Sequence, residues 1–265
     1  MLISIHIPKT AGTSWRLMIE ANCGRQASFV SVESRDREEA ASQAIGLLDA
    51  GCEAEARTLI QASGCQLIHG HRADAFLKLF PDAPAIIWLR DPMERLLSEY
   101  AHLKTFMRQE NKLWQAIHSG SAGLDDLARV HGDIYTRLVA RLDNHPGGYV
   151  AMLTERSGQA EQAVNAALGW RGHLPRRNIA PGAARSGHDA LIDRPGAKTD
   201  SLLASDREIY ETWSQRWLSG EASERAQDLL RAGPRRGPPQ LRNQLRRLAG
   251  VWKEKLGRSL GRDWR

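Results

Sequence analysis

The sequence predicts an α/β fold with a central parallel sheet flanked by helices, because strand-like and helix-like segments alternate along it. Apolar runs at residues 2–7, 65–71 and 84–90 are typical of short, buried strands. A polar segment closes or follows each run, and a helix-like segment comes next. Repeated units of this kind favour a parallel sheet over an all-helical fold. Since ligands bind beyond the carboxyl ends of such strands, the three polar segments are the candidate site.

The other elements follow from periodicity and composition. A further strand is expected over residues 149–153, a mostly helical stretch up to residue 144, and loops over 171–199. The separate helices are expected at residues 14–22, 33–63, 72–80, 159–170 and 204–218. The helix after the third strand has its own start signal: Asp91 as N-cap, Pro92 at the first position and Glu94 at the third predict a capping box.

Charge divides the 265-residue chain into two parts. Its net charge is +6, but residues 233–265 hold ten Lys or Arg and two acidic residues, so residues 1–232 carry 27 basic and 29 acidic groups. We therefore expect a domain over 1–232 and a basic helical C-terminal extension over 233–265. A nearly neutral body argues against a nucleic-acid-binding protein. The extension suits an anionic membrane or a partner surface, and packing on the body or on a second subunit is the alternative.

The composition indicates a soluble protein of a reducing compartment. Hydrophobic residues make up 42% of the chain, and no apolar run is long enough to cross a membrane. The N-terminal residues have the pattern of a first strand and not that of a signal peptide. The three cysteines form no CxxC pair, which indicates free thiols. We expect a cytoplasmic protein. The sequence does not indicate its oligomeric state.

The turn "PKTAGTS" has the residues of an anion site. A turn that opens a helix offers unpaired backbone N–H groups and the positive end of the helix dipole. Gly12 permits close approach of the backbone, and Lys9 adds a mobile charge. Hydroxyl donors come from Thr10, Thr13 and Ser14. The lysine precedes the glycine, so the GxxxxGK[ST] pattern of nucleoside triphosphatases is absent. A polar surface turn is the alternative reading.

The three segments together resemble a known family. "HIPKTAGTS" is similar to the 5′-phosphosulfate loop of sulfotransferases that use 3′-phosphoadenosine-5′-phosphosulfate (PAPS), and "IIWLRDPMERLLSEY" is similar to their 3′-phosphate segment. "HGH" resembles the base-bearing segment of the uronyl and heparan sulfate 2-O-sulfotransferase branch. The resemblance extends over about residues 1–217 and implies a P-loop-like three-layer α/β fold. Because the sequence shows no membrane anchor of the Golgi type, the resemblance implies a bacterial type of enzyme.

The resemblance also implies roles for individual residues. Lys9 would stabilise charge on the leaving 3′,5′-bisphosphoadenosine, and Arg90 and Ser98 would hold the 3′-phosphate, which ATP lacks. Backbone and hydroxyl donors for the 5′-phosphate would come from Thr10, Ala11, Gly12, Thr13 and Ser14. His71 is the expected base for the acceptor hydroxyl, with His69 orienting it, contacting the acceptor or serving as base in its place. No metal is expected, because "HGH" has no further ligand at suitable spacing.

The acceptor is expected to be a saccharide or glycolipid, bound near the inner membrane. Arg176, Arg177 and Asn178 lie where the family closes over its ligands, and Trp170 could stack on a sugar. Their structural alternatives are a solvated loop and a core position. Two other functions stay open: an ATP-using, kinase-like transferase, and a protein that binds a nucleotide or glycan without catalysis.

Overall fold

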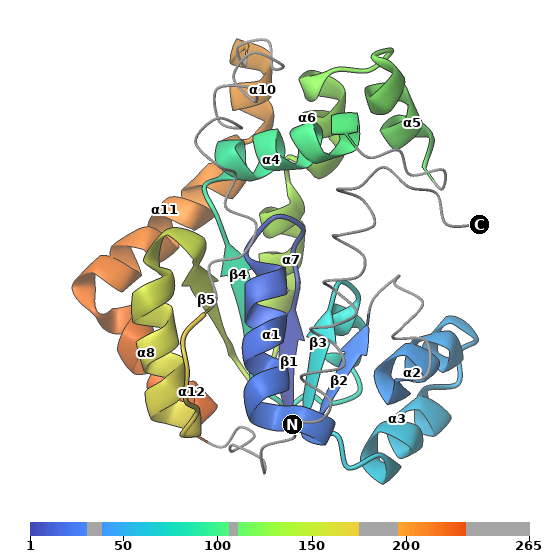
Figure 1. The fold of residues 1–265 in the computed structure, drawn as a ribbon, viewed down its shortest axis with the longest axis vertical. Coiled ribbons are helices and arrows are strands. Elements are labelled where there is room, and N and C mark those ends of the chain that lie inside the picture. The colour runs from blue at the N-terminus through green and yellow to red at the C-terminus, as the bar shows by residue number, and fades with distance from the viewer. Residues whose placement is uncertain (31–38, 106–110, 175–195, 232–265) are drawn as a thin grey trace, which may run out of the picture.

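Five parallel strands form the centre of the molecule (Figure 1). The computed structural model describes residues 1–30, 39–105, 111–174 and 196–231. The strands stand in the order β2-β3-β1-β4-β5. Their bounds are Leu2–Ile5 (β1), Ala27–Val30 (β2), Leu67–Gly70 (β3), Ala85–Leu89 (β4) and Tyr149–Leu153 (β5). The sheet is flanked by helices, so the predicted α/β class is confirmed.

The position of β1 decides which segments meet. β1 pairs with β3 on one side, where Ser4 aligns with His69, and with β4 on the other, where Ser4 aligns with Ile86. Because all three strands are parallel, the segments that follow them emerge at the same edge of the sheet. The turn after β1, the histidine segment and Arg90 are therefore neighbours, as the sequence predicts.

Helices cover both faces of this sheet. In Figure 1, α1 lies in front of β1 and α7 lies behind the sheet, while α12 packs on α8 and β5. Alpha-helices occupy Gly12–Cys23 (α1), Ala40–Asp49 (α2), Glu53–Ala62 (α3), Pro92–Thr105 (α4), Lys112–Ser119 (α5), Leu124–His131 (α6), Ile134–Leu142 (α7), Ser157–Leu168 (α8), Ala197–Leu202 (α10), Ala204–Ser219 (α11) and Glu221–Leu230 (α12). Short 3-10 helices lie at Gly24–Gln26 (η1), Ala73–Phe76 (η3) and Thr154–Arg156 (η4). Among the described residues, none of these helices is both long enough and apolar enough to cross a membrane.

Three tryptophans fill the space between α1 and the sheet. Trp15 lies with its ring centroid 5.5 Å from that of Trp88 and 5.6 Å from that of Trp170, and its Nε1–H donates to Ser4 Oγ over 2.8 Å. Trp170 is only 3% exposed. It is therefore a core residue, and the expectation that it stacks on a sugar is wrong.

Four elements differ from the prediction. The helix expected over 72–80 is only the 3-10 helix η3, which covers Ala73–Phe76. β2 was not predicted, since four residues of mixed polarity carry little periodicity. α12 was not predicted either, and α10 begins within the expected loop 171–199.

Several predictions fall on residues outside the described part of the chain. These are the extension 233–265, with its proposed helix, most of the loops in 171–199, and the three loop residues Arg176, Arg177 and Asn178.

A substitution at Gly70 tests the close approach of β2 and β3 beside the site. A β-carbon at Gly70 would lie 1.8 Å from the Val30 carbonyl oxygen. We expect Gly70→Ala to lower the free energy of unfolding by about 1–3 kcal/mol, the usual cost of overpacking. Urea unfolding measures it.

The matched control is Gly46→Ala inside α2, where a β-carbon has nothing within 4 Å. It should raise the stability by about 0.5–1 kcal/mol, because alanine has less conformational freedom to lose than glycine. Equal stability of the two variants would contradict the close approach at Gly70.

Candidate functional site

The loop between β1 and α1 holds its backbone in an unusual conformation. Lys9 and Ala11 have φ angles of 70° and 62°, in the left-handed region that L-residues other than glycine avoid at a cost of roughly 1–2 kcal/mol each. Thr10 between them is fully buried, and its hydroxyl donates to the Ile7 carbonyl over 2.8 Å. Strained backbone of this kind is typical of ligand-binding turns. The Thr10 hydroxyl therefore stabilises the loop and is not directed at a ligand.

The first turn of α1 is suited to an anion. Ala11 is the N-cap residue, and no side chain in the described part of the chain caps the helix. The first intrahelical bond runs from the Trp15 N–H to the Ala11 carbonyl, so the N–H groups of Gly12, Thr13 and Ser14 have no partner within the helix. A phosphate fits this cradle, because it accepts several hydrogen bonds and is attracted by the helix dipole.

Three histidines gather beside that turn. The ring centroid of His6, at the end of β1, lies 4.2 Å from that of His71 and 5.6 Å from that of His69. Sequence reasoning singled out His69 and His71 but missed His6. The alternation of strand residues contained the signal, because His6 is on the same face of β1 as Ser4, which aligns with His69.

The two predicted histidines differ in accessibility. His69 is 3% exposed, and its Nδ1 lies 3.0 Å from the Ser4 hydroxyl, which also accepts from Trp15. His71 is exposed, and its Nδ1 lies 3.1 Å from the His6 carbonyl oxygen. A carbonyl only accepts, so Nδ1 of His71 carries the proton and Nε2 of the neutral ring carries the basic lone pair. Solvent therefore reaches His71 but not His69.

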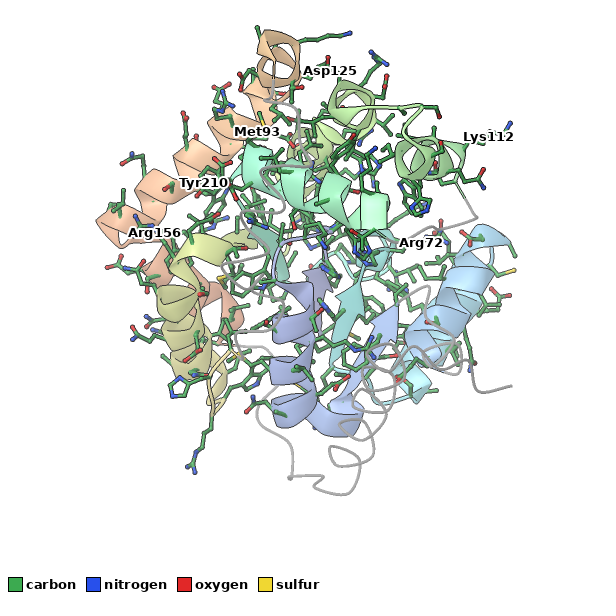
Figure 2. All side chains as sticks on the ribbon, turned by 45° about the horizontal axis from the view of Figure 1, so that its top comes forward. Arg72, Met93, Lys112, Asp125, Arg156 and Tyr210 are labelled. Carbon is green, nitrogen blue, oxygen red and sulfur yellow. The ribbon has the colours of Figure 1, made fainter. Side chains whose placement is uncertain are left out.

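A salt bridge to α2 holds the residue that follows His71. The Arg72 guanidinium donates to both carboxylate oxygens of Asp49 in α2, over 2.8 and 2.6 Å. Figure 2, turned so that this edge comes forward, shows Arg72 and Tyr210 on opposite sides of α1. Because β3 and β4 lie on opposite sides of β1, the site has a β3 side, which carries His71, and a β4 side, which carries Arg90.

The backbone at the end of β4 is held by side chains of other elements. The Tyr135 hydroxyl in α7 donates to the Arg90 carbonyl over 2.8 Å and accepts from the Arg90 N–H over 3.1 Å. Glu155 accepts from the Asp91 N–H, and Thr154 donates to the Leu89 carbonyl. Three consecutive residues therefore have a fixed backbone before any ligand binds. Tyr135 was missed by sequence reasoning, which has no signal for so distant a contact.

The start of α4 differs in part from the predicted capping box. Asp91 accepts from the Glu94 N–H over 2.9 Å, as expected. The Glu94 carboxylate, however, pairs with the Arg90 guanidinium at 3.1 Å, and the Asp91 N–H goes to Glu155. The Arg90 side chain is 26% exposed and is oriented by this pair. Ser98, half-buried on the same helix, lies two turns further along.

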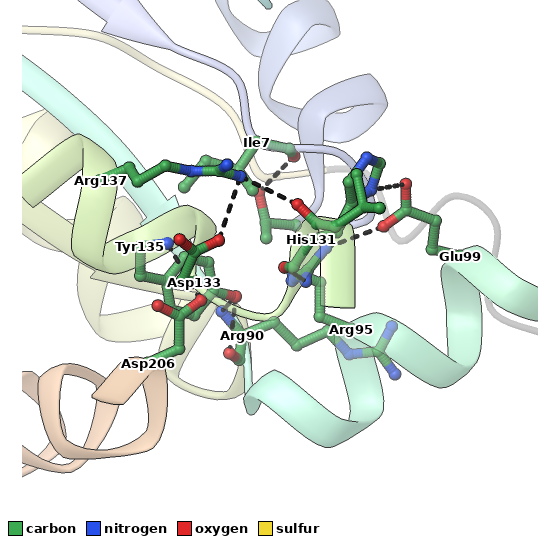
Figure 3. A network of polar contacts seen from close by, with 11 residues as sticks. Ile7, Arg90, Arg95, Glu99, His131, Asp133, Tyr135, Arg137 and Asp206 are labelled. Carbon is green, nitrogen blue, oxygen red and sulfur yellow. Dashed lines mark hydrogen bonds and ion pairs between the residues drawn. The ribbon is translucent and has the colours of Figure 1, made fainter. Parts of the chain in front are cut away.

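A buried charged network anchors α4 (Figure 3). Arg95, fully buried, donates to Glu99 over 2.9 Å and to the His131 carbonyl over 2.6 Å, and the His131 ring lies 2.8 Å from Glu99. Burial by itself would raise the pKa of Glu99, but the hydrogen bond from His131 and the charges of His131 and Arg95 hold it below its usual value. Arg95 is thus paired with an acidic side chain inside the fold.

The model of the sulfotransferase family matches residues 1–146. The chain belongs to the sulfotransferase family. The match includes the turn after β1, the histidine segment and the start of α4, so it covers all three segments of the site. A search of the curated proteins gave no match. Sulfotransferases move a sulfuryl group. In the described ranges of this sulfotransferase, no group of three or more His, Cys, Asp or Glu is arranged to hold a metal ion.

The charged network predicts a pH dependence of stability. A carboxyl group with a depressed folded pKa contributes stability above its unfolded pKa, about 4.3, and loses it as the pH falls through the folded pKa. We expect Glu99→Gln to cost roughly 3 kcal/mol at pH 7, because Arg95 is left buried without its counter-charge. The difference from wild type should shrink as the pH falls from about 4.3 through the depressed folded pKa of Glu99, because the wild-type carboxyl then becomes protonated too.

Urea unfolding between pH 3 and pH 7 measures this difference. The exposed Glu224 in α12 supplies the control, and Glu224→Gln should unfold like wild type throughout. A constant difference between Glu99→Gln and wild type over the whole range would show that the charge of Glu99 is not what stabilises α4.

Proposed function

We propose that this sulfotransferase moves the sulfuryl group of PAPS to a hydroxyl of a saccharide or glycolipid. The observation that carries the proposal is the meeting, at one sheet edge, of an uncapped helix N-terminus, a basic histidine nitrogen and a fixed arginine. An enzyme of this class needs these three groups: one for the 5′-phosphosulfate, one for the acceptor proton and one for the 3′-phosphate.

The donor would lie across β1 and β4. The N–H groups of Gly12, Thr13 and Ser14, with the exposed Thr13 hydroxyl, would bind the 5′-phosphate, and Arg90 and Ser98 would bind the 3′-phosphate. A guanidinium that binds a phosphate through charge-assisted hydrogen bonds suits this task. When bound, PAPS supplies a sulfuryl group on a phosphate that leaves as 3′,5′-bisphosphoadenosine.

The chain's own groups would then act on the two ends of the transfer. Lys9 would stabilise the negative charge that grows on the leaving phosphate oxygen as its bond to sulfur breaks. Nε2 of His71 would take the proton of the acceptor hydroxyl as its oxygen bonds to sulfur. His69, buried and bonded to Ser4, would orient the histidine segment without touching the acceptor.

The acceptor and the setting rest on the resemblance of the histidine segment. "HGH" is similar to the base segment of the uronyl and heparan sulfate 2-O-sulfotransferase branch, which favours a saccharide acceptor. We further propose a bacterial, cytoplasmic enzyme that works beside the inner membrane, with residues 233–265 as the contact. Neither a metal nor a nucleic acid has a part in this proposal.

Calorimetric titration with 3′,5′-bisphosphoadenosine tests the donor class. We expect tight binding to the wild type, weaker binding of 5′-AMP, and no preference for ATP with magnesium. Arg90→Ala should weaken the bisphosphate about ten- to hundredfold, the value of a lost charge-assisted hydrogen bond, and leave 5′-AMP nearly unchanged.

Arg57→Ala is the matched control, because Arg57 is an exposed arginine on α3, which is away from the site, with its guanidinium 5.9 Å from the centre of the Phe80 ring. Its affinity for the bisphosphate should equal that of the wild type. A preference for ATP would indicate a kinase-like enzyme, and an equal loss in both variants would remove Arg90 from the site.

Replacement of His71 tests the base. We expect His71→Ala to bind 3′,5′-bisphosphoadenosine within about threefold of wild type but to transfer sulfuryl groups about 100- to 10,000-fold more slowly, the usual effect of losing a general base. Transfer from radiolabelled PAPS to a panel of oligosaccharides and glycolipids measures the rate.

His118→Ala in α5 is the control, because its Nδ1 also lies near a backbone carbonyl, that of Leu103 at 3.3 Å. It should retain the wild-type rate. A His71→Ala variant as fast as wild type would exclude His71 as the base. Tight bisphosphate binding without transfer to any member of the panel would place the acceptor in another chemical class.

A further inference from the structure

We propose that His6 is a positioning residue that couples the donor loop to the base His71. The inference rests on the proposed function. No side chain before the turn was expected to take part in the site, yet His6 contacts both of its halves. Its backbone lies at the end of β1, where the chain leaves the sheet for the strained loop.

The His6 ring lies between the donor cradle and the base. On one side it packs directly on Gly12, where an added β-carbon would lie 1.9 Å from His6 Nε2. On the other side it is stacked on the His71 ring, with 4.2 Å between centroids and 23° between the ring planes. The ring therefore sets the distance between the first residue of α1 and the base. It also explains why a glycine stands at position 12.

The His6 backbone fixes the histidine segment as well. Its N–H donates to the Gly70 carbonyl over 2.9 Å, and its carbonyl accepts from Nδ1 of His71 over 3.1 Å. Both contacts bridge β1 and the end of β3. The stacked ring keeps the His71 imidazole in the plane in which its Nδ1–H meets that carbonyl, so Nε2 remains the basic nitrogen.

The electrostatic setting keeps His6 itself neutral. Burial lowers the pKa of His6 well below 6.5, and the neighbouring charges of His71, His69, Arg16 and Lys9 lower it further. A neutral ring can stay stacked on His71 while His71 gains a proton, with no like charge opposing it. His6 therefore acts through His71 and not as a second base.

The tautomer of His71 in the wild-type protein is the first test. Two-bond ¹H–¹⁵N correlation spectra of the imidazoles distinguish Nδ1–H from Nε2–H rings. We expect neutral His71 to be mainly the Nδ1–H form in wild type and a mixture of both forms in His6→Ala. The inference would be overturned if His71 is mainly Nε2–H in wild type. It would also be overturned if the His71 signals of His6→Ala are identical to those of wild type.

A pair of substitutions tests the link to the donor loop. Gly12→Ala should weaken 3′,5′-bisphosphoadenosine at least tenfold, because its methyl group displaces the His6 ring and the first turn of α1. His6→Ala/Gly12→Ala should regain an affinity within about threefold of wild type, since the vacated ring leaves room for the methyl group. The double variant should nevertheless keep the mixed tautomer of His71.

Thermal unfolding of the same four proteins separates this inference from the proposed function. Gly12→Ala should lower the melting temperature, and the double variant should recover it. If wild type binds no bisphosphate, the proposed function fails, while the tautomer and the recovered melting temperature still test the role of His6. Additive losses of melting temperature in the double variant would overturn the contact between His6 and Gly12.

Discussion

The pairing of β1 with both β3 and β4 is the constraint on which the site depends. β1 is the first strand in the chain but the middle strand of the sheet. Parallel pairing on both sides brings three polar segments, far apart in sequence, to one edge. A core of three tryptophans supports this arrangement from the α1 face, and Ser4 in the centre of β1 accepts from Trp15 and lies within hydrogen-bond distance of His69.

The same edge contains the non-glycine residues with a left-handed backbone in the described part of the chain. Lys9 and Ala11 are left-handed, and α1 begins without a side-chain cap. A hydrogen bond within the loop and one from a distant helix stabilise this edge: Thr10 bonds back to Ile7, and Tyr135 in α7 fixes the backbone of Arg90. A site that is rigid before its ligand arrives avoids the entropy cost of ordering it on binding. The strain is thus consistent with a pre-formed anion site.

The sequence predicted the fold class, four of the five strands and the meeting of the three segments, because these follow from local apolar runs and from the geometry of parallel sheets. It missed β2 and the 3-10 helix η3, each of which is only four residues long. It also missed Tyr135 and the part that Glu155 takes in capping α4. Such contacts join residues 45 and 64 positions apart, and no local pattern encodes them.

The support of the site divides along β1. Arg90 depends on α7 and on the segment after β5, whereas His71 depends on β3 and on the pair between Arg72 and α2. His6, at the start of the loop after β1, contacts both His71 and the first residue of α1. In the proposed enzyme, the loops on the β2–β3 side would therefore change with the acceptor without disturbing the arginine on the β4 side. The spacing set by the stacked His6 ring would have to stay constant, because in the proposed reaction it relates the leaving group to the base.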